Sequence, residues 1–290
     1  MNVKIGISGY FKLDVVKPDG SVVELAPFQK NLWLDQGLDN FMSSNAYIKY
    51  VHVGTGTSTP VITQTSLDSF LALEQLQSRS MTNSGSPPYY TDTTTVHEFA
   101  VGVFNGQALT EIGLGRSWAG GLSTRSLIKD AGGAPTSVTV LIDEILRVTY
   151  TLRLNVPEVD SVVVLGPYTC TTRAMYANNA GYWGFSQTYQ EIQGSLIQLY
   201  TNASLGSITA NIQGTSVYSS DQTFSRPSAR SFRDTANLTL TEGNQVNGIS
   251  GMTVRNAYFE YAFKTVFSPP IMKTSDELLS LSFDVTWDRV

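Results

Sequence analysis

Residues 3–25 read VKIGISGYFKLDVVKPDGSVVEL, and this stretch sets the fold class. Apolar and polar side chains alternate from Val3 to Val16, which is the period of a strand with one buried face. Pro18-Asp19-Gly20 then supplies turn residues, and Ser21 to Leu25 returns as a second strand. The sequence therefore predicts a β-hairpin at the start of the chain.

One helix is expected directly after the hairpin, from Leu32 to Ser43. Asn31 is a suitable cap for its first turn, and the apolar side chains that follow share one face. Gly37 lowers helix stability by roughly 1 kcal/mol relative to alanine, so packing against a sheet must hold the helix. Residues 66–76 are predicted to form a second short helix.

Strand patterns dominate the rest of the first half. They recur with glycine-bearing connections, which is typical of a meander or a Greek key. Residues 79–95 are rich in Ser, Thr and Pro and are predicted to form an exposed loop. The strands are expected at residues 48–53, 96–104, 109–114, 122–129, 136–142 and 145–154.

A domain boundary is predicted at residues 155–158, because Pro157 has no amide hydrogen to donate to a sheet. It divides the chain into an N-terminal β-rich module, residues 1–155, and a C-terminal β-rich module, residues 156–290. The expected fold is mainly β, with antiparallel β-sandwich-like modules and one or two short helices in the N-terminal half. In the second module we expect strands at 162–165, 195–200, 233–240, 252–267 and 278–287, and a polar loop or interface strap near 213–228.

Two segments of the chain resemble each other. Asp143 to Tyr150 and Asp276 to Phe283 each place an acidic turn before an alternating strand. Two interpretations are open: related hairpins that close a sheet, or a chance similarity between β patterns.

The charge balance argues against several classes of partner. The chain carries 24 acidic and 19 basic residues, a formal net charge of −5, which is the wrong sign for neutralising nucleic-acid phosphates or anionic lipid. The apolar runs are too short to span a bilayer, and the amino terminus does not read as a secretory signal. Direct nucleic-acid binding and membrane insertion are therefore not expected.

Charged residues make up only 15% of the chain, against about 25% in ordinary soluble proteins. A neutral, hydroxyl-rich surface of this kind is expected to face other protein. The alternative is an ordinary all-β domain, since strands and turns also favour Thr, Tyr and Gly. The lone cysteine, Cys170, fits folding in a reducing cytoplasm.

Motifs for catalysis, cofactor binding and metal binding are incomplete. Gly54-Thr55-Gly56 lacks the Gly-Lys-Ser/Thr ending of a phosphate-binding loop, so it is interpreted as a turn or loop. His52 and His97 have no partnering ligand nearby, and Cys170 has no nucleophile signature. No catalytic, cofactor-binding or metal-binding residue is assigned. Two carboxylates held several ångströms apart suffice for a glycosidase, and this hydrolase hypothesis is the least favoured.

Aromatic side chains in two polar segments are the candidate contact residues. Tyr and Trp offer a large rigid surface with a polar tip, which suits both a protein groove and a sugar ring. The alternative is that these rings cover the local core. The candidates are Tyr89, Tyr90, Tyr182, Trp183 and Phe185.

A series of short motifs runs along the chain: Ser8 to Leu13 with Pro18 to Gly20, Asn31-Leu32 through Gly37 to Asp39, Val53 to Thr57, Glu111 to Leu114, Arg125 to Lys129 before Asp143-Glu144, Phe267 to Thr274, and Phe283 to Arg289. In order and spacing they resemble the modular structural proteins of tailed bacteriophages. The resemblance covers most of residues 1–155 and about the last forty residues.

This resemblance implies a virion protein of the tail, the neck or collar, or a fibre, made in the host cytoplasm and present in several symmetric copies. Its partners would be copies of itself and other phage tail or neck proteins. The family carries no cofactor and no catalytic residues to transfer. A second hypothesis is a receptor-binding module of the tail that recognises a host surface glycan through the aromatic segments.

Overall fold

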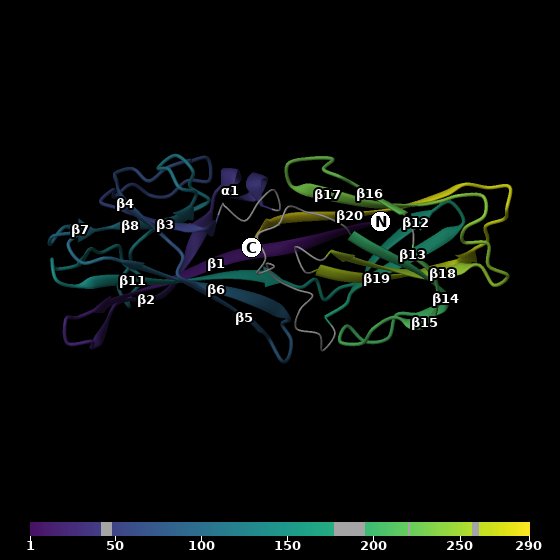
Figure 1. Cartoon of the computed structure of the whole chain (residues 1–290), viewed down its shortest axis with the longest axis horizontal. Helices are drawn as coiled ribbons and strands as arrows, with labels where there is room; N and C mark the ends of the chain where they lie inside the picture. Colours follow the sequence, from purple (N-terminus) through teal and green to yellow (C-terminus); the bar gives the residue numbers. More distant parts are fainter. Residues whose placement is uncertain (42–47, 177–194, 220, 257–260) are drawn as a thin grey trace. The chain divides into compact units, whose positions relative to one another are not determined.

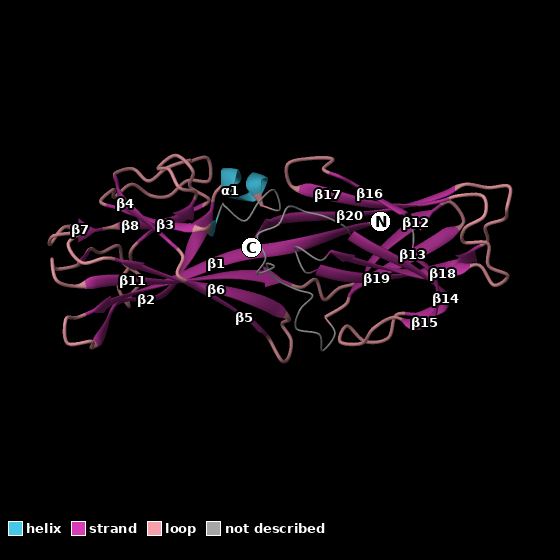
Figure 2. Cartoon of the chain, viewed as in Figure 1, coloured by secondary structure: helices cyan, strands magenta, loops and turns pink. Residues whose placement is uncertain are grey.

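The computed structural model describes residues 1–41, 48–176, 195–219, 221–256 and 261–290. Within these ranges the chain is mainly β, with antiparallel sheets and one short helix, as Figure 2 shows. The prediction of a mainly β fold is therefore confirmed. The strands of the first half are β1 (Asn2–Val16), β2 (Val22–Trp33), β3 (Tyr50–Gly54), β4 (Phe70–Gln75), β5 (Ser78–Asn83), β6 (Tyr90–Phe99), β7 (Ala108–Leu109), β8 (Glu111–Gly115), β9 (Thr124–Leu127), β10 (Val138–Thr139) and β11 (Ile145–Asn155).

The second half contributes nine further strands from the described residues, and no helix among them. These strands are β12 (Ser161–Leu165), β13 (Tyr168–Ala174), β14 (Ser195–Ser204), β15 (Gln213–Ser219), β16 (Asp221–Ser225), β17 (Ser231–Leu238), β18 (Ile249–Asn256), β19 (Tyr261–Ile271) and β20 (Leu279–Arg289).

The chain divides into two compact units, each assembled from separate stretches. The N-terminal unit comprises Ile7–Met81, Asp92–Arg153 and Arg289–Val290, and the C-terminal unit comprises Met1–Gly6, Thr82–Thr91 and Leu154–Asp288. The predicted division into modules of residues 1–155 and 156–290 stays a prediction.

The opening hairpin has the predicted antiparallel pairing. Strand β1 pairs with β2 from Gly9 opposite Asn31 to Val16 opposite Val22 (Figure 1). The returning strand is longer than the predicted 21–25, because it pairs with β1 as far as Asn31 and then with β9, where Leu32 lies opposite Arg125. The period-2 pattern of residues 3–16 thus specifies a strand, and most of the added length of its partner pairs with that same strand.

The helix predicted at residues 32–43 is much shorter in the structure. Helix α1 spans Asp35–Asn40, six residues, and begins after Leu34. The expected cap, Asn31, instead lies in β2, where its side-chain amide donates to the Tyr150 hydroxyl. Sheet pairing therefore determines the conformation of residues 31–33, and the prediction of helix there was wrong.

Gly37 has a packing role that helix propensity did not reveal. A Cβ atom at this position would lie 2.1 Å from the carbonyl oxygen of Ser123. Glycine is therefore what allows α1 to touch the backbone before β9, and this contact requires glycine despite its low helix propensity.

Three segments predicted as helix or loop are strands. Residues 66–76 were expected to be helical, but Phe70–Gln75 forms β4, paired with β3 from Tyr50 opposite Gln75. The predicted loop at 79–95 contains most of β5 and the start of β6, and the predicted loop near 213–228 contains β15 and β16. In β6 the buried residues alternate regularly, and Thr91, Thr93 and Thr95 occupy the inner positions. Threonine there behaves as a β-branched strand residue, which a composition rule for loops cannot recognise.

In the N-terminal unit, strands pair in the order β2-β9-β8-β3-β4. Strand β8 lies between β3 and β9, with Val53 opposite Ile112 and Glu111 opposite Leu127. The side chains of Trp33 and Phe41 meet edge to face with ring centroids 6.3 Å apart in the core of this unit. This arrangement places Glu111 and Arg125 on neighbouring strands.

The C-terminal unit holds a six-stranded sheet in the order β12-β13-β19-β18-β14-β15. In the same unit β17 pairs with β20, with Asp234 opposite Phe283. The ring of Phe283 on β20 packs against the ring of Phe263 on β19 at 5.3 Å. Apolar side chains from both sets of strands therefore share one core. The two similar segments, 143–150 and 276–283, lead into β11 and β20, both of which pair with β1.

Candidate functional site

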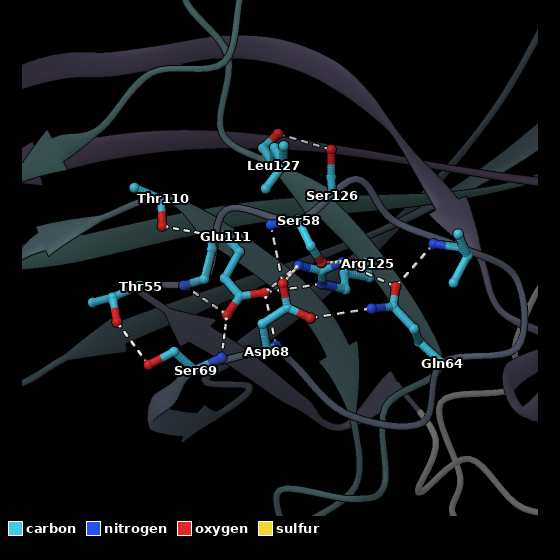
Figure 3. A network of polar contacts seen from close by, with 12 residues as sticks. Thr55, Ser58, Gln64, Asp68, Ser69, Thr110, Glu111, Arg125, Ser126 and Leu127 are labelled. Carbon is cyan, nitrogen blue, oxygen red and sulfur yellow. Dashed lines mark hydrogen bonds and ion pairs between the residues drawn. The ribbon is translucent and has the colours of Figure 1, made fainter.

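A buried network of charged and polar groups occupies the N-terminal unit beneath the connection from β3 to β4, residues 54–69 (Figure 3). At its centre Arg125 on β9 and Glu111 on β8 form an ion pair, with 2.7 Å between Nη2 and Oε2. Both side chains are completely buried. A buried ion pair is tolerated only when its remaining hydrogen-bonding capacity is satisfied.

Glu111 binds the backbone of the 54–69 connection. Its Oε1 accepts from the amides of Gly56 and Ser69 at 2.9 and 2.8 Å, and its Oε2 accepts from the amide of Asp68 at 3.1 Å. A Cβ atom on Gly54 or Gly56 would lie 2.7 or 2.4 Å from Oε1. Glycine at these two positions therefore lets the backbone reach the carboxylate, and the segment is a loop, not a phosphate cradle.

Arg125 uses its whole guanidinium group within the protein. Nε donates to Glu111, Nη1 to Gln64 at 2.9 Å and to Ser58 at 3.4 Å, and Nη2 to Asp68 at 2.9 Å. Together with the Nη2 contact to Glu111, these bonds account for all five N–H donors of an arginine. The group is engaged in holding the loop, and none of its donors is directed at a ligand.

Asp68 completes the network at the surface. Its pKa is lowered, chiefly by a hydrogen bond from the Ser58 side chain and further by the charge of Arg125. The carboxylate also accepts from the Ser58 amide at 3.0 Å and from the Gln64 amide group at 3.2 Å. The arrangement can therefore fix the shape of a loop.

Sequence reasoning did not select Glu111 or Arg125 as a pair. Both occur in the motifs that carry the phage resemblance, but thirteen residues separate them in the sequence and they belong to separate strands. The available signal was a charge inside each of two otherwise uncharged strands, EIGLG and TRSL. Such a pattern indicates buried partners, although it does not say which residues meet.

The predicted aromatic contact residues are only in part described. Tyr182, Trp183 and Phe185 lie outside the described residues. Tyr89 packs against the ring of Tyr176 with centroids 5.0 Å apart, and the Tyr176 hydroxyl donates to the carbonyl of Tyr90 at 2.6 Å. These contacts lie within the C-terminal unit, and a role for Tyr89 and Tyr90 in partner or glycan binding stays a prediction.

The two histidines are buried within the N-terminal unit. One ring nitrogen of His52 bonds the Arg116 carbonyl at 2.7 Å, and the His97 ring bonds the Glu74 carbonyl at 3.2 Å and the Thr95 hydroxyl at 3.0 Å. Burial lowers the pKa of both, to about 4 for His97. In the described part of the chain, no cluster of three or more His, Cys, Asp or Glu side chains is arranged to hold a metal ion.

Two further ionisable groups are buried in the C-terminal unit. The Cys170 thiol faces the core, and burial raises its pKa. Lys264 is fully buried, and its ammonium group donates to the carbonyl of Ala210 at 2.6 Å and to that of Ser207. Burial lowers the pKa of Lys264 to about 8. Both groups contribute to packing, Lys264 by tying a loop onto β19.

A surface pocket of about 340 Å³ opens in the N-terminal unit, lined by Tyr10, Phe28, Asp92, Thr151 and Arg153. Arg153 and Asp92 form a two-bond ion pair at 2.7 and 2.8 Å. The same guanidinium lies 5.3 Å from the centre of the Tyr10 ring, within the range of a cation–π contact. The pocket thus combines aromatic faces with planar polar groups.

Comparisons with protein-family models, with curated proteins and with solved structures found no match to this chain. Among the helices of the described residues, none has the length and apolar character needed to cross a membrane.

Replacing Arg125 tests whether the buried network holds the N-terminal unit together. We expect Arg125→Met to lower the free energy of unfolding by about 3–5 kcal/mol, because it leaves the Glu111 carboxylate buried without its cation. Arg147→Met is the matched control. It breaks the Arg147–Glu98 pair, whose side chains are 34% and 29% exposed, and should cost less than about 1 kcal/mol.

Urea denaturation of both variants gives the comparison. Adding Glu111→Gln to Arg125→Met should recover part of the loss, because the unpaired charge is then removed. Equal stability of the Arg125 and Arg147 variants would contradict a central role for the network.

The buried neutral state of His97 predicts a loss of stability in acid. Its pKa falls from an ordinary 6.5 to about 4 in the folded chain, so between these values the unfolded chain binds a proton that the folded chain does not. The contribution is fully present above pH 6.5 and is lost as the pH falls through 4, by about 3 kcal/mol in all. Unfolding free energies measured across this range should fall less steeply in His97→Gln. Parallel pH curves for the two proteins would refute this assignment.

Proposed function

We propose that this chain is a structural protein of the virion of a tailed bacteriophage, associated with its tail, neck or collar, or fibre, and that it assembles as a symmetric multimer with other virion proteins. In this role it acts without a catalytic residue or a cofactor. Its partners are copies of itself and neighbouring tail or neck proteins, and it is located in the particle after synthesis in the host cytoplasm.

The proposal rests on the structural role of residues from the motifs that resemble phage structural proteins. Gly54, Gly56, Glu111 and Arg125 all belong to these motifs, and all meet in the network beneath the 54–69 loop. Residues that serve architecture in this way suit a building block whose surface loops must hold one shape for its neighbours. Apolar side chains exposed on strands, such as Val22 and Val162, supply contact area for such neighbours.

We further propose that the C-terminal unit is built as an antiparallel β-sandwich-like module. The packing of Phe263 on β19 against Phe283 on β20 supports this, because the two rings come from different sets of strands and share one core. Modules of this kind can present sheet edges and loops to neighbours around a symmetry axis.

The proposal predicts that the chain is a stoichiometric component of viral particles. Particles purified from lysates of the producing cells should contain it in several copies each by quantitative mass spectrometry, and antibodies against it should label the tail or neck in electron micrographs. A chain confined to the particle-free supernatant would refute the proposed function.

A second candidate function, recognition of a host surface glycan, is favoured by the pocket at Tyr10 and Phe28. Phe28 is 56% exposed, so its ring face is available to the apolar face of a sugar. The neighbouring carboxylate, guanidinium and hydroxyl groups suit the hydroxyls of such a ligand.

A glycan array distinguishes this candidate from scaffolding alone. We expect Phe28→Ala to abolish any glycan signal of the full chain, while Trp118→Ala, which removes an equally exposed ring outside the pocket, leaves it unchanged. Equal binding by both variants would exclude this pocket as the glycan site.

A further inference from the structure

Strand β12 forms one edge of the six-stranded sheet in the C-terminal unit, and β13 is its only strand partner in the described part of the chain. Its five residues, SVVVL, pair with β13 in a regular register from Ser161 opposite Thr172 to Leu165 opposite Tyr168. Val163 lies opposite the buried Cys170 and so faces the core, as does Ser161. Val162 and Val164 therefore point to the other face, where they are 60% and 68% exposed.

The opposite edge of the same sheet is protected against pairing with another strand. Strand β15 is polar, and its pairing with β14 is interrupted by register shifts between Leu199 and Tyr200 and between Thr201 and Ser204. Bulges, charged residues and proline are the usual means of blunting an edge. Strand β12 has none of them, and its side chains are the β-branched and aliphatic ones that favour strand pairing.

We propose that the β12 edge is the surface through which two copies of this chain associate, by antiparallel pairing of β12 with β12 across a two-fold axis centred on Val163. This pairing would place Val162 of one copy beside Val164 of the other and continue the sheet from one copy into the next. The inference rests on the proposed function, since it identifies one contact of the multimer.

Charge favours a second copy in this orientation. The segment 161–172 is uncharged, so no charge within β12 repels a second copy of the same strand. The nearest charge is Asp160, which is held by Arg173 through two bonds of 2.7 Å. In the antiparallel arrangement Asp160 lies opposite Gly166 of the second copy. A parallel, in-register arrangement would instead place the two Asp160 carboxylates side by side, which is unfavourable.

The contact is small, and this determines its strength. Five residues per copy provide much less than the roughly 800 Å² per partner of a standard stable interface. The isolated chain should therefore form a weak dimer that depends on concentration. In a multimer with further contacts the same edge would act at a high effective concentration and hold firmly.

Two double variants of the full chain test both the edge and its orientation. In Val162→Lys/Val164→Lys each new lysine meets a lysine of the second copy, so the dissociation constant measured by sedimentation equilibrium should rise by roughly tenfold or more. In Val162→Lys/Val164→Glu each lysine meets a glutamate of the second copy only if the strands are antiparallel. This variant should dimerise at low salt and weaken as salt is added.

Val246→Lys is the matched control, because Val246 is 94% exposed and lies outside β12. It should dimerise like the unchanged chain, and all variants should keep its melting temperature. An unchanged chain that stays monomeric at every concentration, or a double-lysine variant that associates normally, would overturn the inference. A lysine–glutamate variant no stronger than the double-lysine variant would overturn the antiparallel arrangement.

Failure here is separate from failure of the proposed function. A monomeric chain that is nevertheless found in several copies in purified particles would overturn the β12 contact alone. Absence of the chain from particles would overturn the proposed function, whatever the sedimentation result.

Discussion

The buried ion pair between Arg125 and Glu111 is the constraint on which the N-terminal unit depends. Removing two charges from water is expensive, and their mutual attraction offsets that cost only when every remaining donor and acceptor is satisfied. Here the satisfying groups come from the connection between β3 and β4. The two charges therefore hold the loop of about fifteen residues between these strands through its amides and side chains.

The two edge strands of the six-stranded sheet in the C-terminal unit differ in the regularity of their pairing and in their side chains. At β15 the pairing is irregular and the side chains are polar, whereas at β12 the ladder is regular and valines face solvent. A protein that must remain monomeric protects both edges of a sheet. Among the described residues β12 has no second strand partner, and this difference between the two edges supports the pairing proposed for β12.

Most ionisable groups with the potential for chemistry are used within the fold. His97 is held neutral by burial, the Cys170 thiol faces the core, and Lys264 ties the loop at Ser207 to β19. In each case burial shifts the pKa in the direction that favours the neutral form of the group. These groups consequently tune stability against pH. In the Tyr10 pocket, Arg153 and Asp92 reach a concave surface, where they are already paired with each other.

The local pattern of the sequence determined the opening hairpin and the mainly β character, because alternation and turn residues act within a few positions of each other. It also located β11 almost to the residue. It did not determine residues 32–33 or 70–75, which were predicted to be helical but pair with other strands in ladders. Serine- and threonine-rich segments were likewise interpreted as loops, although their hydroxyls lie on paired strands.

Only the tertiary structure decided which charges meet and which edge is open. Glu111 and Arg125 become neighbours because β8 pairs with β9, and the loop amides reach them because β8 also pairs with β3. The exposure of Val162 and Val164 likewise follows from the place of β12 at the end of the sheet order. Strand order depends on the sum of many weak long-range contacts, and no local pattern of residues contains that sum.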